Sequence, residues 1–195
     1  MSKTVRHATV VVAGLGRLGT AFALRAAVDG AAHLVVWDPD RHALAALDER
    51  LAGVAGDTTV HFQHVDLGDA GAIAAAAQRV RHRIGRVDVV ITDSTTGRRA
   101  FFWRSDSGED IRRVMRVNAL SPLYVAREFL PGMLAGRAPG RSIRPARILT
   151  VVPGPGPAPR PRASVTAAAA AAVTTWGKSL RLELRHAGAR HVGVT

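Results

Sequence analysis

Three glycines and one aspartate near the start of the chain have the spacing of a dinucleotide-binding site. Gly14, Gly16 and Gly19 follow an apolar run and precede a helical pattern. At such a junction, glycines allow a tight turn and let the backbone approach a pyrophosphate at a helix N-terminus. Asp38 ends the next apolar run, where a carboxylate accepts hydrogen bonds from an adenosine ribose. Asp38 also suits a turn or a helix N-cap, and the two interpretations are compatible.

The carboxylate of Asp38 favours NAD as the dinucleotide. It would repel the 2′-phosphate of NADP, which an arginine would bind instead. Arg17 and Arg41 are close enough in the sequence to reach such a phosphate, so NADP stays open. Arg17 and Leu18 lie inside the glycine motif and are predicted to contact the cofactor together with the glycines.

Alternating strand-like and helix-like apolar patterns predict how these residues are positioned. The expected fold is α/β: a Rossmann-type, doubly wound parallel sheet of strand order 3-2-1-4-5-6, flanked by helices. Strands are expected at residues 8–13, 33–37, 60–65, 87–91, 147–152 and 191–194. Helices are expected over 20–28, from Asp40 to Leu51, from an Asp69 N-cap to Ile84, over 107–134 with a bend near Pro122, and over 164–187.

Length and composition indicate one soluble domain over residues 1–195. The chain is 47% apolar, lacks cysteine and carries a net charge of +12, almost all of it from arginine. It has no apolar run of the ~18 residues that a membrane span needs, and Arg17 interrupts the N-terminal run too early for a signal peptide. We therefore expect a cytoplasmic location. Because His61 and His64 point to opposite faces of a strand, no metal site is predicted.

Five segments, 64–67, 85–91, 117–118, 129–133 and 179–184, have recognisable family motifs. On these, and over nearly its whole length, the chain resembles the short-chain dehydrogenase/reductase family. The resemblance implies that Asp66 and Leu67, after the third strand, lie against the adenine ring. It also implies that Asn118 is the active-site asparagine and that Asp93 contacts the cofactor, although Asp93 replaces part of the family's Asn-Asn-Ala-Gly segment.

The catalytic residues of that family are missing. Counting back from Glu183, its catalytic Tyr falls on Thr166, its Lys on Ala170 and its Ser on Pro153. A carbonyl reduction needs an acid to protonate the nascent alkoxide, and an aliphatic hydroxyl without a neighbouring cation is too weak an acid. Without these partners, Asn118 is expected to satisfy a backbone carbonyl at a helix bend. The chain is also C-terminally short relative to the family.

Three functions remain open. The favoured hypothesis is an NAD-binding relative with a degenerate active site, acting as a partner subunit or sensor. The second is an active NAD(P)-dependent oxidoreductase whose proton donor is unusual or supplied by another chain. The third is a module that binds nucleic acid or an acidic partner through the arginines of Arg137–Arg147 and Arg160–Arg162. Of the two Pro/Gly/Arg-rich loops, 136–145 and 153–162, the second is expected to be extended and mobile. The resemblance implies a homodimer or heteromer through the long helices around Tyr124 and Trp176.

Overall fold

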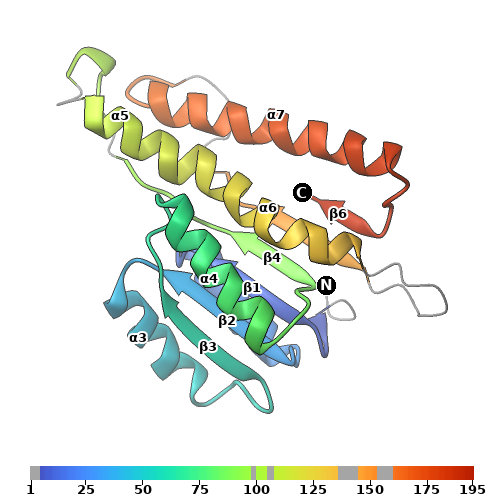
Figure 1. Ribbon diagram of the computed structural model, residues 1–195. Helices are drawn as coiled ribbons and strands as arrows, with labels where there is room; N and C mark the ends of the chain where they lie inside the picture. Colours follow the sequence, from blue (N-terminus) through green and yellow to red (C-terminus); the bar gives the residue numbers. More distant parts are fainter. Residues whose placement is uncertain (1–4, 98–99, 105–107, 136–144, 153–159) are drawn as a thin grey trace.

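A six-stranded parallel sheet forms the centre of the protein (Figure 1). The computed structural model describes residues 5–97, 100–104, 108–135, 145–152 and 160–195. The strand order β3-β2-β1-β4-β5-β6 confirms the predicted doubly wound topology. The strands are β1 Thr9–Ala13, β2 His33–Asp38, β3 Thr59–His64, β4 Val89–Thr92, β5 Ala146–Thr150 and β6 Val192–Val194. Each lies within two residues of its predicted bounds.

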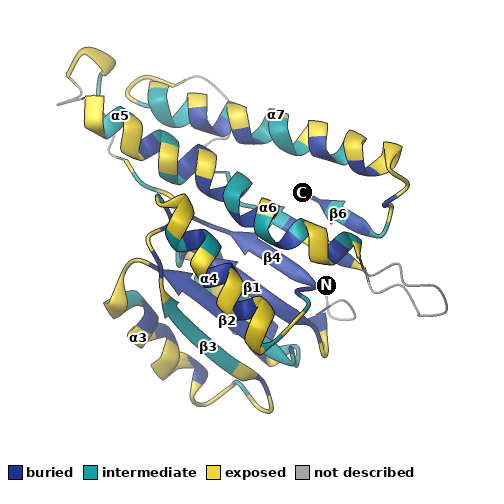
Figure 2. Cartoon of the chain, in the orientation of Figure 1, coloured by how far each residue is buried: buried dark blue, intermediate teal, exposed yellow. Residues whose placement is uncertain are grey.

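Helices cover both faces of the sheet because successive strand residues point to opposite sides. On one face, Val10 and Val12 of β1 pack with α2 (Arg17–Val28) and α3 (Arg41–Leu51). On the other, Val11 and Ala13 pack with α4 (Ala70–Arg83), α6 (Ser121–Leu134) and α7 (Ser164–His186). Figure 2 shows the buried strands between the helices. Within the described residues, no helix is long and apolar enough to cross a membrane.

Two aspartates fix the starts of α3 and α4. Asp40 accepts a hydrogen bond from the amide of His42 at 2.8 Å. Asp69 accepts from Gly71 and Ala72, at 2.7 and 3.3 Å, which confirms it as the predicted N-cap. Helix α2, by contrast, begins at Arg17, three residues before the predicted Thr20.

The long helix expected over 107–134 is interrupted earlier than predicted. Helix α5 (Gly108–Met115) continues into a π-helical turn, η2 (Arg116–Leu120), and then into α6. The irregular turn therefore precedes Pro122, which lies in the first turn of α6, where a missing N–H is tolerated. A 3₁₀ turn, η1, covers Phe102–Arg104. Ser107 and residues 136–144 and 153–159 lie outside the described residues, so the expectation of an extended, mobile loop over 153–162 stays a prediction.

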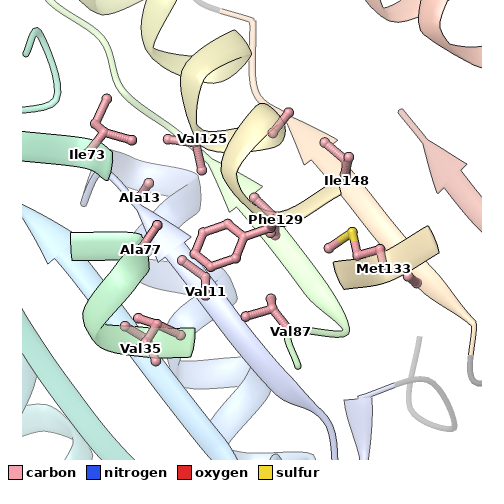
Figure 3. Close-up of a cluster of buried hydrophobic side chains, with 14 of the residues drawn as sticks. Val11, Ala13, Val35, Ile73, Ala77, Val87, Val125, Phe129, Met133 and Ile148 are labelled. Carbon is pink, nitrogen blue, oxygen red and sulfur yellow. The ribbon is translucent and has the colours of Figure 1, made fainter. Parts of the chain in front are cut away.

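Phe129, on α6, packs at the centre of the core between the sheet and α4 (Figure 3). Its side chain is 3% exposed, and its ring centroid lies 5.7 Å from that of Trp37. We predict that Phe129→Ala lowers the free energy of unfolding by about 3–5 kcal/mol, because it removes buried apolar contacts and leaves a cavity. Urea denaturation measures this change. Leu182→Ala, at a side chain that is 63% exposed, is the control and should change stability by less than about 0.5 kcal/mol.

Candidate functional site

A cleft of about 560 Å³ lies at the carboxyl ends of the central strands. Strand order reverses between β1 and β4, and in open α/β sheets ligands bind at such a reversal. The predicted Gly14, Gly16, Asp38, Asp66, Leu67 and Asp93 all line it. The other lining residues are Leu15, Pro39, Gly68, Ser94, Thr95, Thr96, Glu109, Arg113, Arg116 and Val117.

Close packing requires all three glycines: Gly14 and Gly16 lie against the segment after β4, and Gly19 lies against Gly14 within the loop. Gly14 has φ +98°, and a Cβ there would overlap the backbone carbonyl of Asp93. A Cβ on Gly16 would lie 2.5 Å from Oδ2 of Asp93, and one on Gly19 would overlap the carbonyl oxygen of Gly14. The predicted tight turn is present. At Gly16 the group that approaches the loop closely is the side chain of Asp93.

The buried carboxylate of Asp93 caps helix α2. Its Oδ2 accepts a hydrogen bond from the amide of Gly19 at 2.6 Å, and the amide of Leu18 also donates to this side chain. Gly16, the N-cap position, has no side chain to accept such bonds. The Asp93 carboxylate supplies them instead, so the helix can begin at Arg17. Burial raises the pKa of Asp93, and the hydrogen bonds from Gly19 and Leu18 partly oppose that rise.

The carboxylate of Asp38 holds the other side of the glycine loop. Its Oδ2 accepts from the amide of Leu15 at 2.6 Å, and its Oδ1 accepts from the amide of Asp40 at 2.8 Å. The turn interpretation is therefore confirmed, whereas the N-cap of α3 is Asp40. Because each carboxylate oxygen can accept more than one hydrogen bond, Asp38 can still receive a ligand hydroxyl from the cleft.

The remaining predicted cofactor residues divide between the cleft and the outside of α2. Asp66 is exposed and accepts a hydrogen bond from Gly68 at 2.8 Å, while Leu67 is buried in the wall. Arg17 and Leu18 are exposed and do not line the cleft. Arg17 lines a separate groove with Arg25 and Arg50. That groove shares Leu15 and Gly16 with the cleft, so a contact of Arg17 or Leu18 with the cofactor stays a prediction.

The segment after β4 is tied to the π-helical turn, an arrangement that the sequence analysis missed. In η2 the amide of Ser121 donates to the carbonyl of Arg116, which leaves the carbonyl of Val117 without its usual helical partner. The hydroxyl of Ser94 donates to that carbonyl at 3.1 Å. No local sequence pattern indicates this bond, because Ser94 lies 23 residues earlier.

Asn118 anchors the same segment through its side-chain amide. Its Oδ1 accepts from the amide of Thr96 at 2.8 Å, and its Nδ2 donates to the carbonyl of Thr96 at 2.9 Å. Asn118 is buried and does not line the cleft. The expected role at a helix irregularity therefore agrees with these contacts.

Two arginines and one glutamate form the charged wall opposite the glycine loop. Glu109, Arg113 and Arg116 line the cleft, and Arg113 donates to the hydroxyl of Thr96 at 2.9 Å. Their spacing of i, i+4 and i+7 places them on one face of a helix. This signal was present in the sequence and could have identified them.

The positions that correspond to the catalytic residues carry no ionisable side chain in the described part of the chain. Thr166 lines a cavity of about 50 Å³ that also contacts Gly97 and Arg162, and Ala170 is fully buried. Tyr124 packs against the core, and Lys178 is exposed on α7. Pro153 lies outside the described residues. Those residues also contain no cluster of three or more potential metal ligands.

A family model described as short chain dehydrogenase matches residues 7–195. The chain belongs to this family. It is 32% identical over 126 residues to 2-dehydro-3-deoxy-L-rhamnonate dehydrogenase (NAD(+)) of a Sphingomonas strain, which covers 64% of this chain and 47% of that relative. It is 36% identical over 137 residues to mouse dehydrogenase/reductase SDR family member 7B, which covers 67% of this chain and 41% of the relative. The chain thus spans less than half of each of these relatives.

Solved structures of family members have the same fold. One from Burkholderia phymatum, in complex with NAD, has a TM-score of 0.84 at 26% identity, covering 98% of this chain and 65% of that one. A metagenomic short-chain oxidoreductase in complex with NADP has a TM-score of 0.83 at 24% identity, covering 98% of this chain and 81% of that one.

The two residues around which association through the long helices was expected, Tyr124 and Trp176, pack against the core of their own chain. Association of this short-chain dehydrogenase through those helices stays a prediction.

We predict that Asp93 makes stability depend on pH. Burial raises its pKa in the folded chain above the unfolded value, so the folded chain holds this proton more tightly. Stability should therefore fall as pH rises from the unfolded pKa to the folded pKa, and stay level above it. Asp93→Asn should remove this fall, so that the variant gains stability relative to the original chain as pH rises through that window. Urea unfolding at a series of pH values measures the free energy of unfolding of both proteins. If the two plots of this free energy against pH were parallel, the prediction would be contradicted.

A second prediction concerns the anchor at Asn118. Asn118→Ala removes two hydrogen bonds and leaves the half-buried amide and carbonyl of Thr96 without their partners, which should lower the free energy of unfolding by about 1–3 kcal/mol. Chemical denaturation measures the loss. Thr95→Ala, at the exposed neighbouring side chain, should change stability by less than about 0.5 kcal/mol; equal losses in both variants would show that Asn118 is no anchor.

Proposed function

We propose that this chain binds a nicotinamide dinucleotide in the cleft, with NAD preferred over NADP. The observation that carries the proposal is the position of Asp38 beside the glycine loop, at the reversal of strand order. A carboxylate there suits the two hydroxyls of an adenosine ribose and repels a 2′-phosphate. Arg17 and Arg41 do not line the cleft, whereas Asp38 does. Family members whose solved structures contain NAD or NADP support the wider assignment.

The residues of the cleft fit such a ligand. A volume of about 560 Å³ is within the range of small-molecule sites. Asp38 would hold the ribose, Asp66 and Leu67 would lie beside the adenine, and the start of α2 would face the pyrophosphate. When bound, the dinucleotide would supply hydride-transfer chemistry at its nicotinamide ring.

We further propose that the chain does not reduce carbonyls by the family's Tyr/Lys route. Thr166 is too weak an acid to replace a phenol, and buried Ala170 brings no cation to lower its pKa. Lys178 is exposed and lies eight residues beyond Ala170, about 12 Å along a helix. The remaining function is that of a partner subunit or sensor that responds to the dinucleotide.

A binding and turnover experiment tests both parts. Calorimetric titration should give tighter binding of NADH than of NADPH, and Asp38→Asn should reduce that preference, because it removes the charge that repels the 2′-phosphate. Asp48→Asn removes the same charge from the exposed side of α3 and should leave the preference unchanged. With a panel of carbonyl compounds, NADH consumption should stay at background. Equal binding of both cofactors, or turnover comparable with active family members, would contradict the corresponding part.

A further inference from the structure

The start of helix α2 already holds an anion. Asp93 accepts hydrogen bonds from the amides of Leu18 and Gly19 in the first turn. On the other side of the loop, Asp38 accepts from the amide of Leu15 at 2.6 Å. Two side chains of the protein thus occupy three of the amides with which a glycine loop and helix start would bind phosphate oxygens.

Few amides are left for a bound phosphate. In the described part of the chain, the amides of Gly16 and Arg17 have no hydrogen-bond acceptor. Asp93 lines the cleft, and its Oδ2 is close to Gly16. A phosphate that reached the two remaining amides would therefore lie next to a carboxylate. In a partly buried site, two like charges at that separation repel each other strongly.

We propose that Asp93 determines the affinity of the cleft for phosphate-bearing ligands, because its carboxylate competes with the pyrophosphate of the dinucleotide for the N-terminus of α2. This inference rests on the proposed function. The dinucleotide binds the form of the protein in which Asp93 is protonated, so that binding takes up one proton. Protonation keeps an oxygen that can accept the hydrogen bonds of the helix amides and removes the charge that repels the ligand.

The other charges around the cleft do not neutralise this carboxylate. Asp38 at the end of β2, Asp66 after β3 and Glu109 on α5 add negative charge. Arg113 is hydrogen-bonded to Thr96, and Arg116 lies on η2 in the opposite wall. Burial raises the pKa of Asp93, which brings protonation closer to the pH at which the ligand binds.

The test measures the affinity for NAD⁺ by calorimetry between pH 5.5 and 8. In the original chain the dissociation constant should rise with pH, by up to about tenfold per pH unit, because binding takes up one proton once the competing carboxylate is charged. In Asp93→Asn, which keeps the acceptor oxygen, NAD⁺ should bind about tenfold more tightly at pH 8, with little dependence on pH. Asp48→Asn serves as the charge-matched control and should behave like the original chain.

Adenosine separates the effect on phosphate from a general change of the cleft. It lacks phosphate, so the original chain and Asp93→Asn should bind it equally at every pH. If Asp93→Asn gained affinity for adenosine and for NAD⁺ equally, the inference would be overturned. Identical, pH-independent NAD⁺ binding by the original chain and Asp93→Asn would also overturn the inference, but it would leave the proposed function standing. Absence of NAD⁺ binding by both proteins at every pH would overturn the proposed function itself, and the inference with it.

Discussion

The hydrogen bonds between Asp93 and the start of α2 are the interaction on which the cleft depends. They join the end of β4 to the glycine loop, and they hold that loop so close to Asp93 that no side chain fits at Gly14 or Gly16. They also supply the acceptors that a glycine N-cap lacks. The geometry expected for a phosphate site therefore also serves the folded protein without a ligand.

Short-range signals in the sequence were sufficient for most of the fold. Period-two and period-3.6 apolar patterns place each strand within two residues, and the strand order follows from right-handed crossovers. Asp69 could be assigned as a cap because it accepts from residues two and three positions along. The start of α2 could not, since its capping carboxylate lies 74 residues away from Gly19 in the sequence.

In the candidate site, too, short-range sequence signals identified some residues and long-range contacts could not be predicted. Gly14, Gly16, Asp38, Asp66 and Asp93 were all predicted, and all line the cleft. Helical spacing alone would have added the charged wall on α5 and η2. The bonds from Ser94 to the π-helical turn and from Asn118 to Thr96 required the tertiary structure, because each joins segments more than 20 residues apart and neither partner has an unusual sequence context.

The π-helical turn divides one long helix into two halves, α5 and α6, whose side chains can face different directions. It adds one residue to a helical turn, so α5 presents Arg113 to the cleft while α6 directs Val125 and Phe129 into the core. Removal of a single residue from Arg116–Leu120 would restore an even helix of nearly the same length. The same residues wound as an even α-helix, with none removed, would instead rotate one half by about 100° relative to the other. The inserted residue thus acts as a phase adjustment, allowing a core-packing helix and a cleft wall to share one continuous backbone.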